Sequence, residues 1–246
     1  MSSNVEHWTR ANAEFDDAEA AQRWAESDLS WGLWRTPEAK IGVLGDVSGL
    51  DVVELGCGTA YFSAWLTRLG ARAVGVDPTP AQLETARRMQ AKFGVEFALV
   101  EGFGAEVPLP DASFDLVLSE YGASLFADPY RWIPEAHRLL KLGGRLVFMR
   151  PSPLLYLCAG EDGLTERLLH PMSGMNRVEK PGDRVEFVLS HSDLFGLLRR
   201  TGFEIENLVE VYAPEDAQRH ERYSYTTPEW ARKWPAEEIW AARKPG

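Results

Sequence analysis

Short apolar runs alternate with amphipathic segments five times in the first two thirds of this chain, and this alternation constrains the fold most. The first run, Asp51–Leu55, is apolar and is followed by glycines, as is typical of a buried strand in a parallel sheet. Further strands are expected at 73–76, 95–100, 114–118 and 145–149. Phe62, Leu66 and Leu69 recur at the spacing of one helix face. Strands and helices that alternate in this way predict an α/β fold with a doubly wound, mostly parallel sheet.

A single domain is expected to span the whole chain, because 246 residues suffice for one large α/β unit. The alternation stops after Arg150, where prolines and glycines become frequent, as in an insertion that covers a site. The predicted organisation is an N-terminal helical cap over 1–45, a ligand-binding core over 46–150, a cap insertion over 151–185 and the C-terminal part of the sheet over 186–246.

The loop after the first strand, Glu54-Leu-Gly-Cys-Gly-Thr59, indicates a ligand site. In doubly wound sheets ligands bind beyond the carboxyl ends of the strands, where glycines allow close approach and a helix N-terminus attracts an anion. A dinucleotide motif would have a third glycine where Tyr61 stands, and Glu54 would repel a pyrophosphate. Asp77 ends the second strand, 21 residues after Gly56, where a carboxylate can accept both ribose hydroxyls. A ligand with a carboxylate, an ammonium and a free ribose fits these residues, and S-adenosylmethionine has all three.

Several stretches occur in the order of a known family's motifs. They are Val52–Thr59, Gly75–Pro78, Val107–Val117 and Leu139–Leu146, followed more weakly by Leu198–Phe203. In these stretches the chain resembles class I S-adenosylmethionine-dependent methyltransferases, and most closely the ubiquinone and menaquinone methyltransferase-like branch. The resemblance implies a seven-stranded, Rossmann-like methyltransferase sheet with helical and loop caps. It also implies S-adenosylmethionine as the cofactor and S-adenosylhomocysteine as its product.

The resemblance also assigns cofactor contacts to individual residues of this chain. Glu54, Gly56, Cys57 and Gly58 would surround the methionine end, Asp77 would hold the ribose, Pro78, Ala105 and Glu106 would lie at the adenine, and Ser119, Glu120 and Tyr121 would lie beside the methyl group. One position departs from the family, which usually has an aspartate for the adenine amino group where this chain has Gly104.

Candidates for catalysis and for the acceptor site are fewer. Methyl transfer from a sulfonium is an in-line displacement, in which the protein mainly aligns the acceptor and excludes water. The candidate bases are His191 and Glu120, with helix capping by His191 and cofactor contact by Glu120 as the alternatives. The predicted acceptor wall consists of Trp31, Trp34, Tyr121 and His170, with ordinary packing or a surface position as the alternative.

Composition narrows the possible partners and location. Lys and Arg number 26 against 37 Asp and Glu, so the net charge of −11 disfavours a nucleic-acid groove. Two cysteines provide no disulfide framework, and no Cys or His spacing predicts a metal site. We find neither a signal peptide nor a run of 18 apolar residues. A cytoplasmic protein without metal, nucleic acid or membrane insertion is therefore expected.

The resulting prediction is a methyltransferase that acts on a small, apolar or aromatic molecule, with O-methylation favoured over C- or N-methylation. One alternative is a non-catalytic protein that binds S-adenosylmethionine or S-adenosylhomocysteine. The other is a nicotinamide-dependent reductase, against which Glu54 and Tyr61 argue. The identity of the acceptor and the oligomeric state stay open.

Overall fold

The computed structural model describes residues 2–14, 17–161, 163–182, 184–219 and 225–246. Its centre is a seven-stranded sheet in the order β12-β13-β7-β6-β3-β4-β5. The strands are β3 (Asp51–Leu55), β4 (Arg72–Asp77), β5 (Ala98–Glu101), β6 (Phe114–Glu120), β7 (Leu140–Pro151), β12 (Glu204–Val211) and β13 (Glu237–Arg243). Strands β3 to β7 pair in parallel, whereas β13 is antiparallel to both of its neighbours. The predicted seven-stranded, mostly parallel sheet is confirmed.

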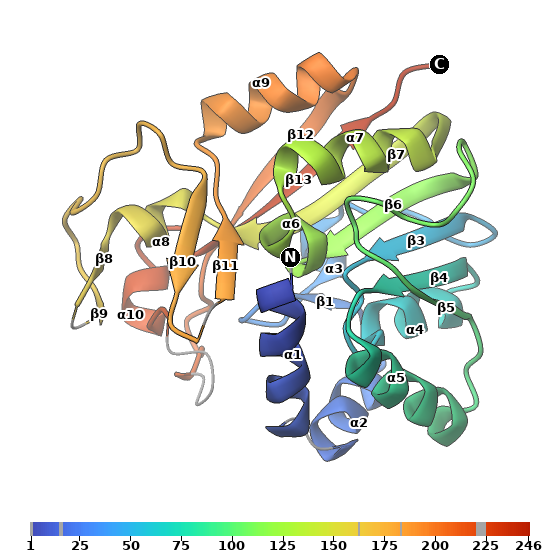
Figure 1. Ribbon diagram of the computed structural model, residues 1–246. Helices are drawn as coiled ribbons and strands as arrows, with labels where there is room; N and C mark the ends of the chain where they lie inside the picture. Colours follow the sequence, from blue (N-terminus) through green and yellow to red (C-terminus); the bar gives the residue numbers. More distant parts are fainter. Residues whose placement is uncertain (1, 15–16, 162, 183, 220–224) are drawn as a thin grey trace.

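Helices cover both faces of the sheet (Figure 1). In β7, Leu146 and Phe148 join a core with helices α7 (Pro129–Leu139) and α9 (His191–Thr201), whose apolar side chains lie on that face. Val147 and Met149 point to the opposite core, which α4 (Tyr61–Arg68) completes. Successive residues of a strand alternate between faces, so a sheet buried on both sides requires continuous apolar runs. This requirement explains the short apolar segments in the sequence.

The strand order reverses between β3 and β6. After β3 the chain adds β4 and, beyond α5 (Pro80–Phe93), β5 on one side, and then crosses back to place β6 on the other side. The loops that follow β3 and β6 touch through their backbones: a Cβ atom on Gly56 would lie 2.5 Å from Cα of Gly122. Gly56 also has a φ of 77°, so both space and backbone conformation require glycine there. Doubly wound sheets bind ligands beside such a reversal, at the carboxyl ends of the strands.

Two further parts of the chain meet over this edge. The N-terminal part contains α1 (Ser2–Glu14), α2 (Asp17–Ala25), β1 (Ser30–Trp31), β2 (Thr36–Pro37) and α3 (Glu38–Ile41). The later part contains α8 (Pro153–Leu157), β8 (Ala159–Gly160), β9 (Gly163–Leu164), the hairpin β10 (Arg177–Lys180) and β11 (Arg184–Phe187), and α10 (Pro228–Ala231). The Asn4 side chain joins them, because its amide accepts from Val185 N at 2.8 Å and donates to Val185 O at 2.9 Å. Within the described residues, no helix combines the length and apolar character needed to cross a membrane.

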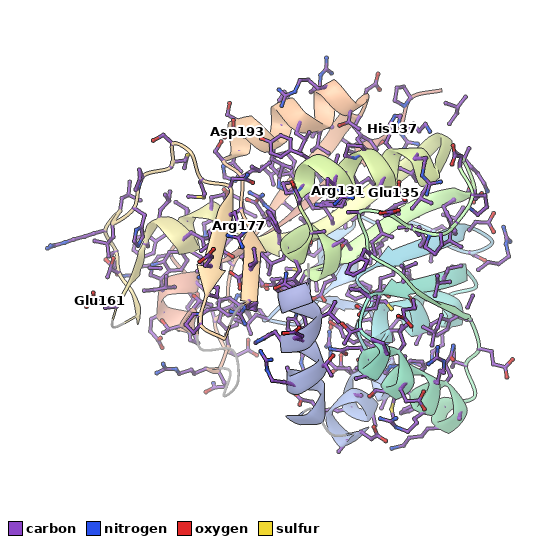
Figure 2. The ribbon with its side chains drawn as sticks, viewed as in Figure 1. Arg131, Glu135, His137, Glu161, Arg177 and Asp193 are labelled. Carbon is purple, nitrogen blue, oxygen red and sulfur yellow. The ribbon has the colours of Figure 1, made fainter. Side chains whose placement is uncertain are left out.

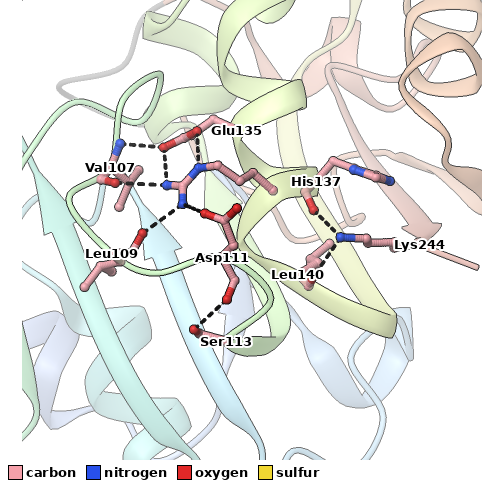
Figure 3. A network of polar contacts seen from close by, with 9 residues as sticks. Val107, Leu109, Asp111, Ser113, Glu135, His137, Leu140 and Lys244 are labelled. Carbon is pink, nitrogen blue, oxygen red and sulfur yellow. Dashed lines mark hydrogen bonds and ion pairs between the residues drawn. The ribbon is translucent and has the colours of Figure 1, made fainter. Parts of the chain in front are cut away.

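A polar network holds the segment before β6 in place (Figure 3). Arg138 of α7 donates to the backbone oxygens of Val107 at 3.0 Å and Leu109 at 2.9 Å. Its guanidinium also pairs with Glu135 at 2.7 Å and with Asp111. Charge-assisted hydrogen bonds of this kind fix geometry well. The motif stretch 107–117 therefore owes its conformation to a helix that follows it in the chain.

Candidate functional site

Asp77, at the end of β4, links the two loops at the cofactor edge. Its carboxylate accepts from the backbone N–H of Gly58 at 2.9 Å and from that of Thr79 at 2.8 Å. The side chain is buried, and burial raises the pKa of its carboxyl. An ionised carboxylate has about four acceptor positions. The Thr79 side chain also hydrogen-bonds to this carboxylate, so about one acceptor position remains for a ligand.

Glu54, on β3, is the second buried acid of this edge. It accepts from the backbone N–H of Ser63 at 2.9 Å and from the Ser63 hydroxyl. Burial raises the pKa of Glu54 to about 8, and the nearby charges of Glu120 and Asp77 act in the same direction. The fold thus holds an acid that is costly to ionise until a positive charge is supplied.

Glu120, at the end of β6, is the third acid. It accepts from the Tyr61 hydroxyl at 2.7 Å and from the backbone N–H of Gly32 at 3.1 Å. Burial raises the pKa of Glu120, while Tyr61 and the charge of Arg23 oppose that rise. Arg23 lies over the Tyr61 ring, with its guanidinium carbon 4.6 Å from the ring centre. Tyr61, which stands where a dinucleotide motif would have a glycine, therefore helps to hold Glu120 in place.

The glycine loop brings its own backbone to the same cavity. Gly56, Cys57 and Gly58 line it together with Glu54 and Asp77. Burial raises the pKa of the Cys57 thiol well above its usual range, so this group is a neutral packing residue. A Cβ atom on Gly75 would lie 3.0 Å from the Cys57 sulfur, which shows how closely β4 packs beneath the loop.

The predicted adenine end has an apolar character. Pro78, Phe103 and Ala105 line the cavity there. Packing explains why glycine stands at position 104, because a Cβ atom there would lie 2.6 Å from the Cβ of Ala123. A side chain such as the family's aspartate does not fit between this loop and α6 (Gly122–Phe126). The sequence interpretation missed Phe103, which is partly exposed and is the aromatic surface of this end.

Glu106 lies apart from this cavity. Its side chain is 86% exposed and is 3.9 Å from Arg131 of α7, which Figure 2 labels. It lines a shallow neighbouring hollow with Phe103 and Pro78. The structure therefore brings Ala105, and not the Glu106 carboxylate, into the cavity wall.

Tyr121 is the most unusual residue of the methyl end. Its φ is 57°, a left-handed value that is rare for a bulky residue and concentrates at functional sites. The Tyr121 hydroxyl donates to Oε1 of Glu237 and lies 3.0 Å from the hydroxyl of Tyr225. Leu33 N donates to the same Glu237 oxygen at 2.7 Å.

Glu237, the first residue of β13, lies behind Tyr121 and is fully buried. Its Oε2 atom has no hydrogen-bond partner in the part of the chain that the structure describes, and burial raises the pKa of its carboxyl to about 8. Buried polar atoms normally have partners, so this acid needs an explanation. Sequence analysis missed it, because no motif distinguishes it from the neighbouring Glu238.

Besides Glu106 and the two tryptophans of the predicted acceptor wall, three predicted site residues lie outside the cavity lining. His191 begins α9, and its Nε2 atom is 2.6 Å from Glu238. Ser119 is buried, and its hydroxyl donates to Leu55 O at 2.8 Å. His170 is exposed, with Nε2 2.8 Å from Ala159 O. The structure does not bring these side chains together with Glu54 and Asp77.

The two tryptophans of the predicted acceptor wall pack into apolar clusters. Trp31 is fully buried and donates from Nε1 to Glu38 at 2.6 Å. Trp34 is half-buried against the same core and the insertion. The intervening Gly32 and Leu33 line the cavity instead. The segment thus reaches the site through its turn rather than through its indole rings.

One cavity of about 560 Å³ connects these parts. The three acids and the glycine loop form one end of its wall. Tyr121 and Tyr225 lie along it, and Tyr156 of α8 and the hairpin β10–β11 form the part contributed by the insertion. A volume in this range suits a small ligand.

Comparison with known proteins gives a consistent result. Residues 53–148 match the model of the family described as "Methyltransferase domain". Demethylmenaquinone methyltransferase of Tropheryma whipplei (strain Twist) is 32% identical over 134 residues, 50% of this chain and 54% of the relative. Malonyl-[acyl-carrier protein] O-methyltransferase of Serratia marcescens is 30% identical over 141 residues, 57% of this chain and 49% of the relative. The chain spans about half the length of these curated relatives.

A solved structure extends the similarity over most of the fold. The S-adenosylmethionine-dependent methyltransferase from Mesorhizobium loti has a TM-score of 0.64 and 26% identity, covering 83% of this chain and 95% of the other. Residues 53–148 are thus similar to a methyltransferase domain, and most of the fold is similar to an S-adenosylmethionine-dependent methyltransferase. The matched region contains both β3 and β6, so the glycine loop, Asp77 and Glu120 lie inside it. The insertion and Glu237 lie outside the region of the family model.

Proposed function

We propose that this chain transfers a methyl group from S-adenosylmethionine to an oxygen of a small molecule. The observation that carries the proposal is the group of three carboxylates that line one cavity, the buried Glu54 and Asp77 and the half-buried Glu120. Burial raises the pKa of all three acids. Such a cluster favours a ligand that brings positive charge, and it disfavours a pyrophosphate.

The chain offers suitable groups for each part of this cofactor. Glu54 suits the ammonium, the remaining acceptor position of Asp77 suits a ribose hydroxyl, and Pro78 with Phe103 suits the adenine faces. S-adenosylmethionine supplies a methyl group already activated on a sulfonium, so transfer to oxygen breaks the carbon–sulfur bond, forms a carbon–oxygen bond and releases the hydroxyl proton. The protein then has to orient the acceptor, exclude water and take up that proton.

Tyr121 and Glu237 provide a route for the proton. In this proposal the Tyr121 oxygen accepts the proton of the acceptor hydroxyl as Tyr121 passes its own proton to Glu237. One proton enters and one leaves Tyr121, which ends the step neutral. A carboxyl with a pKa of about 8 is a suitable acceptor near neutral pH. We assign this role to Glu237 and not to the two bases expected from the sequence. His191 lies outside the cavity lining. The oxygens of Glu120 already accept from Tyr61 and Gly32.

Binding and turnover test the proposal separately. Calorimetry is expected to show S-adenosylhomocysteine binding and no heat with NADP; the reverse would overturn the cofactor assignment. Incubation with S-adenosylmethionine and a panel of phenols and hydroxy acids, followed by mass spectrometry, is expected to reveal methyl ethers. Binding of S-adenosylhomocysteine without methylation of any panel member would refute O-methylation and favour a non-catalytic binding protein.

A further inference from the structure

A hairpin of the insertion carries two positive charges on the face that lines the cavity. In the register of β10 and β11, Lys180 lies opposite Arg184, and Val178 lies opposite Glu186. Residues directly opposite in an antiparallel pair point to the same side of the hairpin. Lys180, Arg184 and Glu186 all line the cavity, so this charged face is turned toward the proposed acceptor.

The charges on this face do not balance. Like charges directly opposite each other destabilise a pair of strands, and Lys180 and Arg184 are such a pair. Glu186 lies between them, with an oxygen 3.0 Å from Arg184 and another 3.8 Å from Lys180. The same carboxylate also accepts from the Tyr156 hydroxyl at 2.7 Å. Two cations against one carboxylate leave one positive charge on the described residues of this face.

Arg184 also has a hydrogen-bond donor without a partner among the described residues. Its Nε atom is buried and makes no hydrogen bond to any residue that the structure describes. Arginine donors are normally satisfied when buried, and the guanidinium fork fits a carboxylate closely. The unpartnered donor of Arg184 therefore occurs beside the surplus positive charge of the Lys180–Arg184–Glu186 group at the wall of the cavity.

Three tyrosines line the cavity together with this face: Tyr156, Tyr225 and Tyr121. The Tyr156 hydroxyl donates to Glu186. The Tyr225 hydroxyl lies 3.0 Å from the Tyr121 hydroxyl. A small molecule along these tyrosines can therefore place one end at the hairpin and another at Tyr121.

We propose that Lys180 and Arg184 form a carboxylate site, so that the methyl acceptor is a small hydroxy acid held by its carboxylate at the hairpin. The inference rests on the proposed function and specifies its substrate class. A monoanion matches the single surplus charge, whereas a doubly charged phosphate would leave a negative charge uncompensated in a partly buried place. The apolar residues Leu155 and Leu164, which line the cavity, are available to the carbon skeleton.

The test compares acids with neutral analogues on protein saturated with S-adenosylhomocysteine. The probes are 4-hydroxycinnamate, its amide and its methyl ester, with inorganic phosphate as the other anion, and binding is followed by ligand-detected NMR. The acid is expected to bind at least ~10-fold more tightly than the amide or the ester, as a charge-assisted pair should. Equal binding of acid and amide, or preference for phosphate, would overturn the proposal.

Variants locate the selectivity. Arg184→Gln is expected to reduce the preference for acid over amide to about onefold, and Lys180→Gln is expected to weaken it independently. Arg177→Gln is the matched control, because Arg177 lies on the same hairpin, is labelled in Figure 2 and pairs with Glu179 outside the cavity lining. Unchanged selectivity in both test variants, with folding verified by circular dichroism, would sink the assignment. If the native chain does not bind S-adenosylhomocysteine, the proposed function itself is contradicted.

Discussion

Replacing Glu54 by glutamine should stabilise the free protein while weakening cofactor binding. The amide oxygen can still accept from the Ser63 backbone and hydroxyl, so the local contacts are kept. What disappears is the carboxylate whose pKa burial raises from 4.5 to about 8. At ~1.4 kcal/mol per pKa unit, ionising this group in the folded state costs ~5 kcal/mol more than in the unfolded chain.

The sign of the pH dependence follows from that difference. Because the folded-state pKa lies above the unfolded value, the contribution of Glu54 to stability is fully present below about pH 4.5 and is lost as pH rises through about 8. The variant should therefore gain little at about pH 5 and several kcal/mol at about pH 8.5. For a chain of this size, ~2–4 °C in melting temperature accompanies each kcal/mol.

Melting curves from about pH 5 to pH 9 measure the effect, and calorimetry measures the affinity for S-adenosylhomocysteine. We expect the melting temperatures of the variant and the native chain to diverge as pH rises, and the variant's affinity to fall at least ~10-fold. Glu96→Gln is the control, since Glu96 is exposed and does not line the cavity. Two results would refute this description of Glu54: a difference in melting temperature between variant and native chain that does not change with pH, or an unchanged affinity for S-adenosylhomocysteine.

Three further changes test other parts of the site. Asp77→Ala should lower the affinity for S-adenosylhomocysteine at least ~10-fold. It should also destabilise the free protein by ~1–3 kcal/mol, because the backbone N–H groups of Gly58 and Thr79 lose their acceptor. An unchanged affinity in calorimetry would contradict this prediction. In the native chain kcat should rise with pH through about 8, as Glu237 loses its proton. Glu237→Gln should lower kcat ~100-fold and remove this rise, while the affinity for the cofactor is retained. A variant whose kcat still rises with pH would exclude Glu237 as the proton acceptor. Trp31→Ala should cost ~3–5 kcal/mol in urea unfolding, since Trp31 is fully buried; a small loss would show that it is not a core residue.

The local patterns of the sequence predicted the parallel strands and the loops that follow β3 and β4, whereas the seven-stranded sheet came from the family resemblance. Strand β3, the glycine loop and Asp77 follow one another over a short stretch, so periodicity and spacing were enough to place them together. Strand boundaries were less accurate: β5 covers Ala98–Glu101 where 95–100 was predicted, because Gly94 ends α5 with a left-handed φ of 63° and the strand starts only after a short loop.

The acceptor side of the site could not be predicted in the same way. Glu237 reaches Tyr121 only because β13 inserts antiparallel between β7 and β12, and no local pattern encodes that pairing. Trp31 was expected at the acceptor, but indole burial is decided by tertiary packing, which here places its ring against Phe62. The sequence likewise does not show that Lys180 and Arg184 line the cavity, because the tertiary fold decides which face of the hairpin is turned toward it.

The distribution of charge along the cavity gives the acceptor a direction. Glu54 suits the ammonium of the cofactor, while Lys180 and Arg184 attract an anion to the hairpin. The net charge of −11 does not oppose this, because at physiological salt the Debye length is ~8 Å and distant surface charges are largely screened. A hydroxy acid is therefore driven to enter with its carboxylate at the hairpin, which leaves its hydroxyl toward Tyr121. Added salt should weaken this orientation less than it weakens exposed ion pairs, since partly buried charges are screened less.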